Sequence, residues 1–384
     1  MLQPVFPAEL LVPPRILFGP GVLKALGEVA GDLGRRALLV TGSASVQRGG
    51  TLGKIEAVLR AHGVAAVHVI VRKEPDVEAV DAAAQAGRMG NCDVVIAVGG
   101  GSAIDLAKSA AGMIPNDGSL LDYLEGVGTG KVMARAPVPL VAVPTTAGTG
   151  SEATKNAVIN GFSLTKGPFK KSFRDPRLVP AAAIVDPELS IGASPGITAA
   201  CGMDALTQLV EPLTSLNATA VTDALAVTGI EAVGRSLQRA VENGYGLDAR
   251  ADMSYAALLS GVCLSNAGLG AVHGLASPVS AHAPIPHGHI CAVLLPLVTE
   301  ANLKALRAGR GRQEALHGYE RAEGALGAPI PDFCGRFSIR GFGSFGLKAE
   351  DLPRVAAGAT SGSMKTNPVV LSPAELEDIL RRAL

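Results

Sequence analysis

The sequence has few charged residues and no long uninterrupted apolar run. Charged residues make up 18% of its 384 positions, and 34 basic side chains balance 34 acidic ones. This balance argues against a surface whose main task is to bind nucleic acid or another polyanion. No stretch of about eighteen residues is free of glycine, proline and charge, so the sequence does not favour a membrane span.

The N-terminal segment and the cysteines favour a reducing compartment. The opening MLQPVFPAELLVPPRILFGPG lacks the basic start and apolar core of a secretory signal, so we expect a cytoplasmic protein. The cysteines are odd in number, far apart and form no CxxC pair, which suits reduced thiols better than disulfides. We expect all of them to be buried apolar filler, namely Cys92, Cys201, Cys263, Cys291 and Cys334.

The first half of the chain alternates short β-branched runs with alanine-rich stretches. The runs at 36–42, 65–71, 92–101, 138–146 and 181–187 predict strands bounded by glycine or proline. Between the first three, LGKIEAVLRAHG and VEAVDAAAQAGRMG predict helices that each end at a glycine cap. Repetition of strand, helix and strand predicts a largely parallel sheet with helices on both faces.

After about Ser190 the strand signal fades. Three long alanine- and leucine-rich segments, 194–215, 219–243 and 248–270, begin with Ser, Thr or Asp as helices do. A chain of this length has room for two domains. We therefore expect an α/β domain over residues 1–190, followed by an all-α domain over residues 191–384. Residues 305–345 are the least informative part.

A glycine turn follows the third predicted strand. In VVIAVGGGSAIDLAKSAAG, Gly99, Gly100, Gly101 and Ser102 stand between a strand and a helix. Glycines let backbone amides approach an oxyanion, and the helix N-terminus adds positive partial charge. The turn therefore predicts a diphosphate site, although a tight turn without a ligand is the alternative.

A second turn of similar character is VPTTAGTGSEAT. Thr145, Thr146, Thr149 and Ser151 offer hydroxyls that can line a phosphate or a ribose. Neither turn matches GxGxxG or a Walker loop, so a nucleotide-binding sheet of another lineage is expected.

The end of the first predicted strand bears on the type of nucleotide. In dinucleotide folds an acidic residue near a strand end holds the adenosine ribose and repels a 2′-phosphate. Here the strand ends at Gly42 and Ser43, followed by Ser45 and Arg48. Without a carboxylate at this point, NADP is at least as well suited as NAD.

Four of the seven histidines fall between His273 and His289. Asp204 and Gln208 are four residues apart in a predicted helix, so both project from one face. Together with His273 and His287 they form a candidate divalent site for iron or zinc. The alternative is that Asp204 and Gln208 face solvent and that the histidines cap helices.

Taken together, these segments resemble the iron-containing (group III) alcohol dehydrogenases of the dehydroquinate-synthase-like superfamily. The matching segments span nearly the whole chain and are RILFGPG, GGGSAIDLAK, VPTTAGTGSEAT, AIVDPEL, GMDALTQLVEP, AVHGLASP, PHGHICAVLLP and SMKTNPVVLS. The resemblance implies a Rossmann-like N-terminal domain and a helical C-terminal domain around a cleft. It also implies a homodimer formed through the N-terminal segment.

The resemblance assigns roles to individual residues. The diphosphate falls on Gly99, Gly100, Gly101 and Ser102, with Thr145, Thr146 and Thr149 along the cofactor and Lys170, next to Lys171, in contact with it. The metal ligands become Asp204, Gln208, His273 and His287. His289 is expected to help frame its loop, while His62, His68 and His317 receive no role.

Two positions depart from the family pattern. The family has histidine where this chain has Gln208, whose amide oxygen is a weaker donor for iron or zinc. It also has a second histidine where this chain has Ser277, at the position that helps to pass the alcohol proton to solvent. Ser277, a water molecule or His282 is expected to serve instead.

The expected activity is NAD(P)-dependent, metal-assisted oxidation of a small alcohol, or reduction of the corresponding aldehyde. The cofactors are NAD or NADP, with NADP slightly favoured, and Fe²⁺ or Zn²⁺. Three alternatives stay open: a metal-independent reductase of the maleylacetate reductase kind, a metal-dependent cyclase of the dehydroquinate synthase kind, and a non-catalytic nucleotide-binding relative.

Overall fold

The computed structural model describes residues 7, 9–42, 46, 50–163, 167–337, 339–359 and 362–384. Contacts within the chain divide it into two compact units. One comprises Leu11–Thr146 and Gly150–Ile191, and the other Met1–Leu10, Ala147–Thr149 and Gly192–Leu384. We call them the sheet unit and the helical unit. The predicted boundary between independent domains at residues 190 and 191 stays a prediction.

The sheet unit is built on six parallel strands in the order β1-β8-β5-β4-β2-β3. Their bounds are β1 Arg15–Phe18, β2 Arg36–Gly42, β3 Ala65–Val71, β4 Val94–Gly99, β5 Leu140–Pro144 and β8 Ala182–Val185. The five strands predicted from the sequence are all present. The short edge strand β1 was not predicted.

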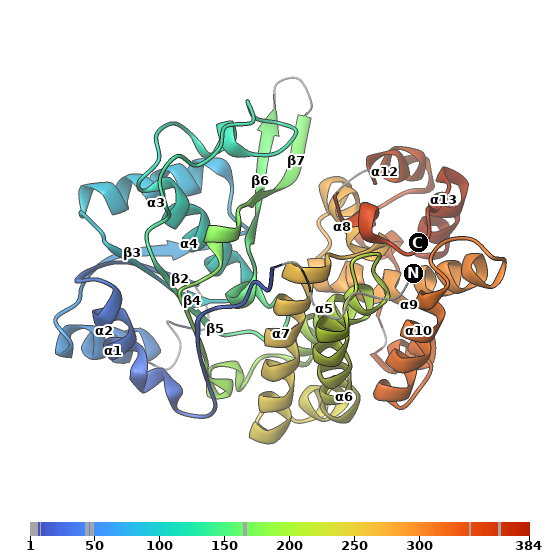
Figure 1. Ribbon diagram of the computed structural model, residues 1–384, viewed down its shortest axis with the longest axis horizontal. Coiled ribbons are helices and arrows are strands. Elements are labelled where there is room, and N and C mark those ends of the chain that lie inside the picture. The colour runs from blue at the N-terminus through green and yellow to red at the C-terminus, as the bar shows by residue number, and fades with distance from the viewer. Residues whose placement is uncertain are drawn as a thin grey trace. The chain divides into compact units, whose positions relative to one another are not determined.

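Helices cover both faces of this sheet (Figure 1). Along β2, Leu38 and Val40 belong to the core shared with α3 and α4, whereas Ala37 and Leu39 belong to the core shared with α1 and α2. This alternation arises because successive strand residues point to opposite faces. The helices are α1 Leu26–Leu33, α2 Thr51–Ala61, α3 Val77–Met89 and α4 Gly101–Met113. The expected doubly covered parallel sheet is confirmed.

The two helix ends predicted at glycine caps differ in detail. After α2, Gly63 adopts a left-handed φ of 72°, one residue beyond the C-cap His62. After α3, the C-cap Gly90 keeps a right-handed φ of −78°, and Asn91 takes the positive φ of 47° instead. Gly90 is thus the expected C-cap of α3, and the left-handed residue follows it, at an asparagine, which tolerates that region better than most residues.

A two-stranded antiparallel ribbon lies between β5 and β8 in the sequence. It comprises β6 Asn156–Ser163 and β7 Gly167–Arg174. Figure 1 shows this ribbon extending from the rest of the sheet unit. Val158 donates its backbone N–H to Asp105 on α4 at 3.0 Å, which ties the ribbon to that helix. The sequence pattern did not predict this ribbon.

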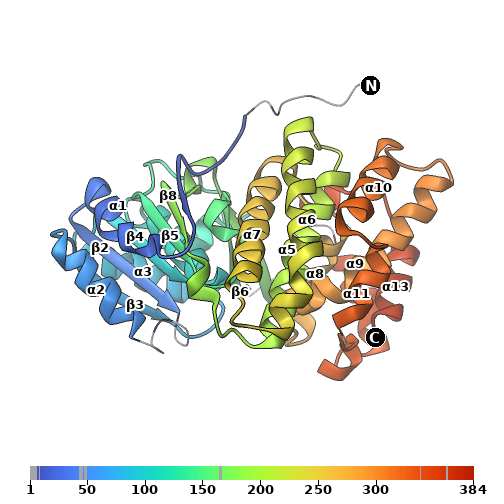
Figure 2. The same cartoon turned by 90° about the horizontal axis from the view of Figure 1, so that it is seen from below.

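The helical unit contains nine α-helices among the described residues. They are α5 Pro195–Thr214, α6 Ala220–Glu242, α7 Leu247–Ala267, α8 Ala271–His282, α9 His287–Arg307, α10 Glu314–Leu326, α11 Ile330–Cys334, α12 Leu352–Gly358 and α13 Pro373–Arg382. Figure 2 shows α5, α6 and α7 side by side. The expected all-helical second half is confirmed.

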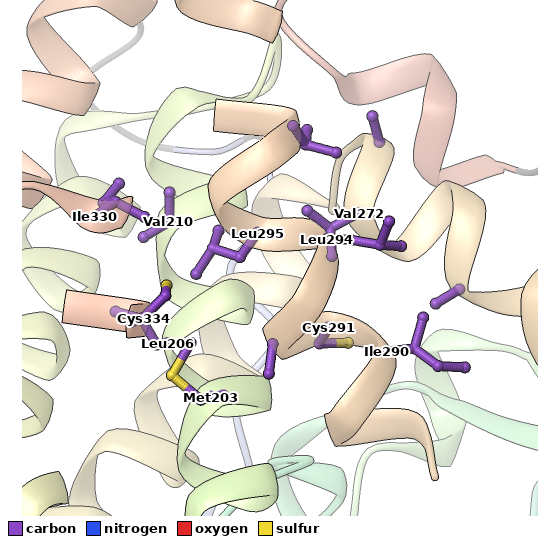
Figure 3. Packing of buried hydrophobic residues seen from close by; sticks show 14 of the residues in the cluster. Met203, Leu206, Val210, Val272, Ile290, Cys291, Leu294, Leu295, Ile330 and Cys334 are labelled. Atoms are coloured by element: carbon purple, nitrogen blue, oxygen red, sulfur yellow. The ribbon is translucent and has the colours of Figure 1, made fainter. Parts of the chain in front are cut away.

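One core holds these helices together. Met203, Leu206 and Val210 on α5 belong to the same buried cluster as Ile290 and Leu294 on α9 (Figure 3). By length and composition alone, helix α9 and the bent pair of α7 and α8 are long and apolar enough to cross a membrane. Their apolar residues contribute to this core, so packing within the helical unit accounts for the composition.

Candidate metal centre and nucleotide turns

Helix α5 places three acidic or amide side chains along one buried stripe. The helix begins after Ser194, whose hydroxyl accepts the N–H of Ile197, with Pro195 in its first turn. Asp204, Gln208 and Glu211 follow at spacings of four and three, so they share one face. They are only 2%, 3% and 6% exposed, respectively. Buried groups of this kind need partners.

The side chain of Glu211, which belongs to α5, reaches the N-terminus of α8 and fixes the ring of His273. Its Oε1 accepts the backbone N–H of Val272 at 2.7 Å, and its Oε2 lies 2.6 Å from His273 Nδ1. The N-terminus of a helix favours a carboxylate through its free amides and its dipole. Glu211 therefore orients the imidazole and leaves Nε2 available for another partner.

Helix α9 supplies two further donors. It begins at His287 after Pro286, and Cys291 follows four residues later on the same face. A Cβ on Gly288 would lie 2.3 Å from the carbonyl oxygen of Ala200. Glycine at 288 therefore allows the start of α9 to pack directly against α5, which carries Asp204.

These elements bring four donor atoms together. Nε2 of His273 and Nε2 of His287 lie 3.4 and 3.6 Å from Asp204 Oδ1. The Sγ atom of Cys291 lies 3.7 Å from each of these nitrogens. Within the described ranges this is one group of donors, all within 4.8 Å of one another, that could hold a metal ion.

The electrostatics of the group suit a cation. Burial alone would raise the pKa of Asp204, but His287, His273 and Gln208 together lower it below its ordinary value. Burial would lower the pKa of His273, but its interactions with Cys291, Glu211 and Asp204 raise it well above its usual range. Without a metal, positive charge is thus supplied by protons, which a divalent cation would replace.

One side of the group is open. The His287 side chain is 31% exposed, compared with 3% for Asp204. His287 is therefore the ligand candidate with most contact with solvent, while Asp204 and Cys291 are buried.

The remaining residues predicted for this site lie around the group. Gln208 donates from Nε2 to Asp204 Oδ1 at 3.1 Å, and its Oε1 accepts the Ser260 hydroxyl at 3.2 Å. Ser277 lies one turn after His273 on α8, and its carbonyl accepts the Ser280 hydroxyl. His282 is exposed at the end of α8 and contacts the Pro278 carbonyl through Nδ1 at 2.8 Å.

His289 lies in the first turn of α9 and contacts the segment that follows α11. Its Nε2 lies 2.6 Å from the Arg340 carbonyl oxygen, and its ring contacts Phe345 at a centroid distance of 4.8 Å. These contacts fix the segment that follows α11 rather than the metal group.

The glycine turn lies at the carboxyl edge of the sheet, at its topological switch point. Strands β2 and β4 are neighbours in the sheet. The strand that follows β2 in the sequence, β3, lies on the far side of β2, and the strand that follows β4, β5, lies on the far side of β4. In open α/β sheets ligands bind at such a point. Gly42 ends β2 and Gly99 ends β4, and a Cβ on Gly99 would lie 3.1 Å from the Gly42 nitrogen. The close approach of the two strand ends requires glycine.

The start of α4 completes this edge. Its N-cap is Gly100, which has no side-chain cap, so the first amides of the helix face the turn. A Cβ on Gly100 would meet Thr146 Oγ1 at 3.1 Å, and Thr145 donates its N–H to the Gly99 carbonyl at 2.9 Å. Gly99 to Ser102, Thr145 and Thr146 thus lie together, in an arrangement that suits a phosphate.

Other predicted cofactor contacts are less closely grouped. Thr149 belongs to the helical unit, unlike Thr145 and Thr146. Lys170 lies on β7 and pairs with Glu74 Oε2 at 2.9 Å. Ser43 lies outside the described residues.

Two residues of this site were not predicted from the sequence: Cys291, which belongs to the metal group, and Glu211, which orients His273. Glu211 follows Asp204 by seven residues, and Cys291 follows His287 by four; both spacings put the side chain on the face of a known candidate. Cys291 was expected to be apolar filler, and its contacts with two imidazoles show that this description is incomplete.

Comparisons with known proteins agree with this combination of sheet and metal group. The iron-containing alcohol dehydrogenase profile matches residues 13–187, and the C-terminal profile of the Fe-containing alcohol dehydrogenase family matches residues 198–384. The chain therefore belongs to the iron-containing alcohol dehydrogenases, which are oxidoreductases that act on alcohols.

Individual relatives cover most of the chain. Alcohol dehydrogenase 4 of Saccharomyces cerevisiae strain YJM789 is 34% identical over 379 residues, 97% of each chain. Long-chain-alcohol dehydrogenase 1 of Geobacillus thermodenitrificans strain NG80-2 is 40% identical over 293 residues, 76% of this chain and 72% of the relative. Among solved structures, a 1,3-propanediol oxidoreductase superimposes with a TM-score of 0.87 at 33% identity, covering 98% of this chain and 99% of the other.

Proposed function

We propose that the chain is a metal-assisted, NAD(P)-dependent dehydrogenase that interconverts small alcohols and the corresponding aldehydes. The observation on which this rests is the convergence of Asp204, His273 and His287, from three helices, on one point. The Nε2 atoms of His273 and His287 lie 3.4 and 3.6 Å, respectively, from Asp204 Oδ1. These separations and donor types fit iron or zinc.

The residues of the metal group and its surroundings have different roles in this reaction. Asp204 supplies the negative charge that a cation needs, Glu211 orients His273, and the exposed side at His287 admits the substrate oxygen. A divalent cation bound here would supply Lewis acidity, which lowers the pKa of the alcohol hydroxyl and polarises the carbonyl in the reverse direction.

The sheet edge holds the cofactor. The amides at the start of α4 and the hydroxyls of Thr145 and Thr146 bind the diphosphate, and Thr149 and Lys170 are further contacts. The bound nicotinamide supplies the hydride chemistry. We infer that NADP is accepted at least as well as NAD, since β2 ends at Gly42 without a carboxylate.

For the proton of the alcohol, Ser277 is a better candidate than His282. Ser277 is four residues after His273 and therefore lies on the same face of α8. His282 is nine residues after His273, which corresponds to roughly 13 Å along a helix and about half a turn around it. The helix therefore directs His282 away from the metal group.

We also propose a homodimer formed at the edge strand β1. Ile16 and Phe18 are 39% and 40% exposed on this strand, and Val12 just before it is 38% exposed. An exposed apolar edge strand is a template for pairing with a second chain. Light scattering after size exclusion should give twice the monomer mass, and Ile16→Lys with Phe18→Lys should give the monomer.

The activity is tested with protein purified without oxygen and without added chelator. Elemental analysis would be followed by an alcohol and aldehyde panel with NAD and with NADP, before and after chelation. We expect about one iron or zinc per chain and activity that is lost on chelation and restored by metal. Full activity after chelation would instead identify a metal-independent reductase, and a strong preference for NAD would contradict the inference from Gly42.

A further inference from the structure

The metal group contains a sulfur that the family pattern does not assign. Cys291 Sγ lies 3.7 Å from Nε2 of His273 and 3.7 Å from Nε2 of His287. Cys291 is completely buried, and it projects from α9 one turn after His287 (Figure 3). Both histidine nitrogens are atoms that also face Asp204. The sulfur therefore faces the same point as the other three donors.

The separations match the edges of a coordination tetrahedron. Zinc binds nitrogen and oxygen at about 2.0–2.1 Å and thiolate sulfur at about 2.3 Å, which puts tetrahedral N and S about 3.6 Å apart and N and O about 3.3 Å apart. The structure has 3.7 Å for both N to S separations and 3.4 and 3.6 Å for the N to O separations. Four of the six edges of the group thus have the lengths of a tetrahedral centre, and all of its donor atoms lie within 4.8 Å of one another.

Gln208 does not compete for this position in its present orientation. Its amide nitrogen, which is not a metal donor, faces Asp204 Oδ1 at 3.1 Å. Its oxygen accepts the Ser260 hydroxyl at 3.2 Å. Gln208 thus supports the carboxylate from outside, in the manner of a residue that orients a ligand.

Another buried cysteine shows what apolar filler looks like in this unit. Cys263 on α7 is also 0% exposed and belongs to the same core. Its sulfur lies 3.5 Å from the Thr222 carbonyl oxygen, and it is not part of the group of donors around Asp204. Both cysteines are buried, but only Cys291 lies close to imidazole nitrogens.

We propose that the thiolate of Cys291 is a fourth protein ligand of the cation, in place of the imidazole that the family has at position 208. This rests on the proposed metal-assisted function and specifies its centre as one carboxylate, two imidazoles and one thiolate. The thiol proton passes to solvent when the sulfur binds. Because thiolate is a soft ligand, the centre favours zinc over harder cations such as Mn²⁺ and Mg²⁺.

Cobalt provides a direct test, since a thiolate ligand gives Co²⁺ a near-ultraviolet charge-transfer band that oxygen and nitrogen ligands do not. The full chain is stripped of metal, titrated with Co²⁺ and compared with Cys291→Ala and Cys263→Ala, which remove the same atom from the same core. We expect the band in the parent and in Cys263→Ala. Cys291→Ala should lose it and bind Co²⁺ at least about tenfold more weakly.

A second measurement does not depend on a variant that folds. X-ray absorption of the zinc-loaded parent should show one sulfur at about 2.3 Å among nitrogen and oxygen neighbours. Metal bound with activity, but without the band and without a sulfur neighbour, would overturn the role of Cys291 and leave the proposed function standing. Failure to bind any of these metals would overturn both.

Discussion

Each unit buries a cluster of charged side chains, and the two clusters are completed differently. In the sheet unit, Lys108 is 0% exposed and its Nζ lies within 2.7–2.9 Å of four oxygens from Ser151, Thr154 and Asn156. Asp105 and Glu152 lie within electrostatic reach of its charge. This cluster contains its own cation.

The cluster in the helical unit has no such ammonium. Asp204, His273, His287 and Cys291 point donor atoms at one another, and the pKa of His273 is raised well above its usual range. Lone pairs that converge in a buried place are costly unless something positive lies between them. The comparison teaches that a buried charged cluster is structural when it is internally paired, and that it indicates a ligand site when its acceptors converge.

The largest expected effect is that of Asp204→Asn, which tests whether the cluster in the helical unit binds a metal. Asp204→Asn keeps the shape of the side chain and removes its charge, so metal retention and alcohol oxidation should fall together, by roughly a thousandfold in rate. Metal content by elemental analysis and steady-state kinetics measure the two losses.

The same variant also tests whether the Asp204 cluster is needed for folding. The metal-free variant should unfold within about 1 kcal/mol of the metal-free parent, because an amide at 204 can still accept a hydrogen bond. A loss of several kcal/mol would mean that the two clusters are alike and that the comparison fails.

Lys108→Met should affect stability rather than chemistry. The substitution leaves the carbonyl oxygens of Ser151, Thr154 and Asn156 without their buried donor, at a cost of about 3–5 kcal/mol in the free energy of unfolding. Denaturant unfolding of the metal-free variant measures this cost, and metal stoichiometry of the folded fraction should stay that of the parent. Loss of metal binding at full stability would contradict the structural role.

The sheet was largely predictable because its signal is local. Strands β2 and β3 have the predicted bounds, since each is a short, mainly apolar run with β-branched residues that is closed by a glycine or by a charged residue. Strand β1 has only four residues, and β6 pairs with β7 in a ribbon whose two strands are each defined by the other. Such short or mutually paired elements leave little periodicity in the sequence.

The metal group was predictable only in part because its members come from three helices. Asp204, His273 and His287 were found through residue type and resemblance. Glu211 and Cys291 were not, although helical spacing places both on the correct faces. A buried cysteine is most often apolar filler, and only the position of α8 relative to α9 shows that this sulfur meets two imidazoles.

Glu152→Gln should change how stability depends on pH. Burial raises the pKa of Glu152 from 4.5 to about 7, against the opposing effects of its backbone hydrogen bond and of Lys108. The folded state then holds this proton more tightly than the unfolded state, so the stabilisation is present below the unfolded pKa and is lost as pH rises through the folded pKa. Over this window the loss is about 3 kcal/mol.

The variant removes this dependence. Subtracting its free energy of unfolding from that of the parent, at several pH values from about 4.5 to 8, should give a difference that falls steadily by about 3 kcal/mol. A difference that does not change with pH would show that the Glu152 carboxylate is fully compensated by Lys108, which would make the sheet-unit cluster even more self-contained.

The smallest effect concerns Gln208, the residue at the rim of the metal group. Gln208→Met keeps the length of the side chain and removes the hydrogen bonds to Asp204 and Ser260. The affinity for zinc should fall by about tenfold, as for other residues that orient a ligand. Gln208→His adds an imidazole next to Asp204 and should tighten binding by a similar factor. Competition with a chromophoric chelator at fixed pH measures both. Equal affinities in the parent and both variants would show that the carboxylate needs no partner from position 208, and that the side chains of α8 and α9 alone determine how strongly the cation is held.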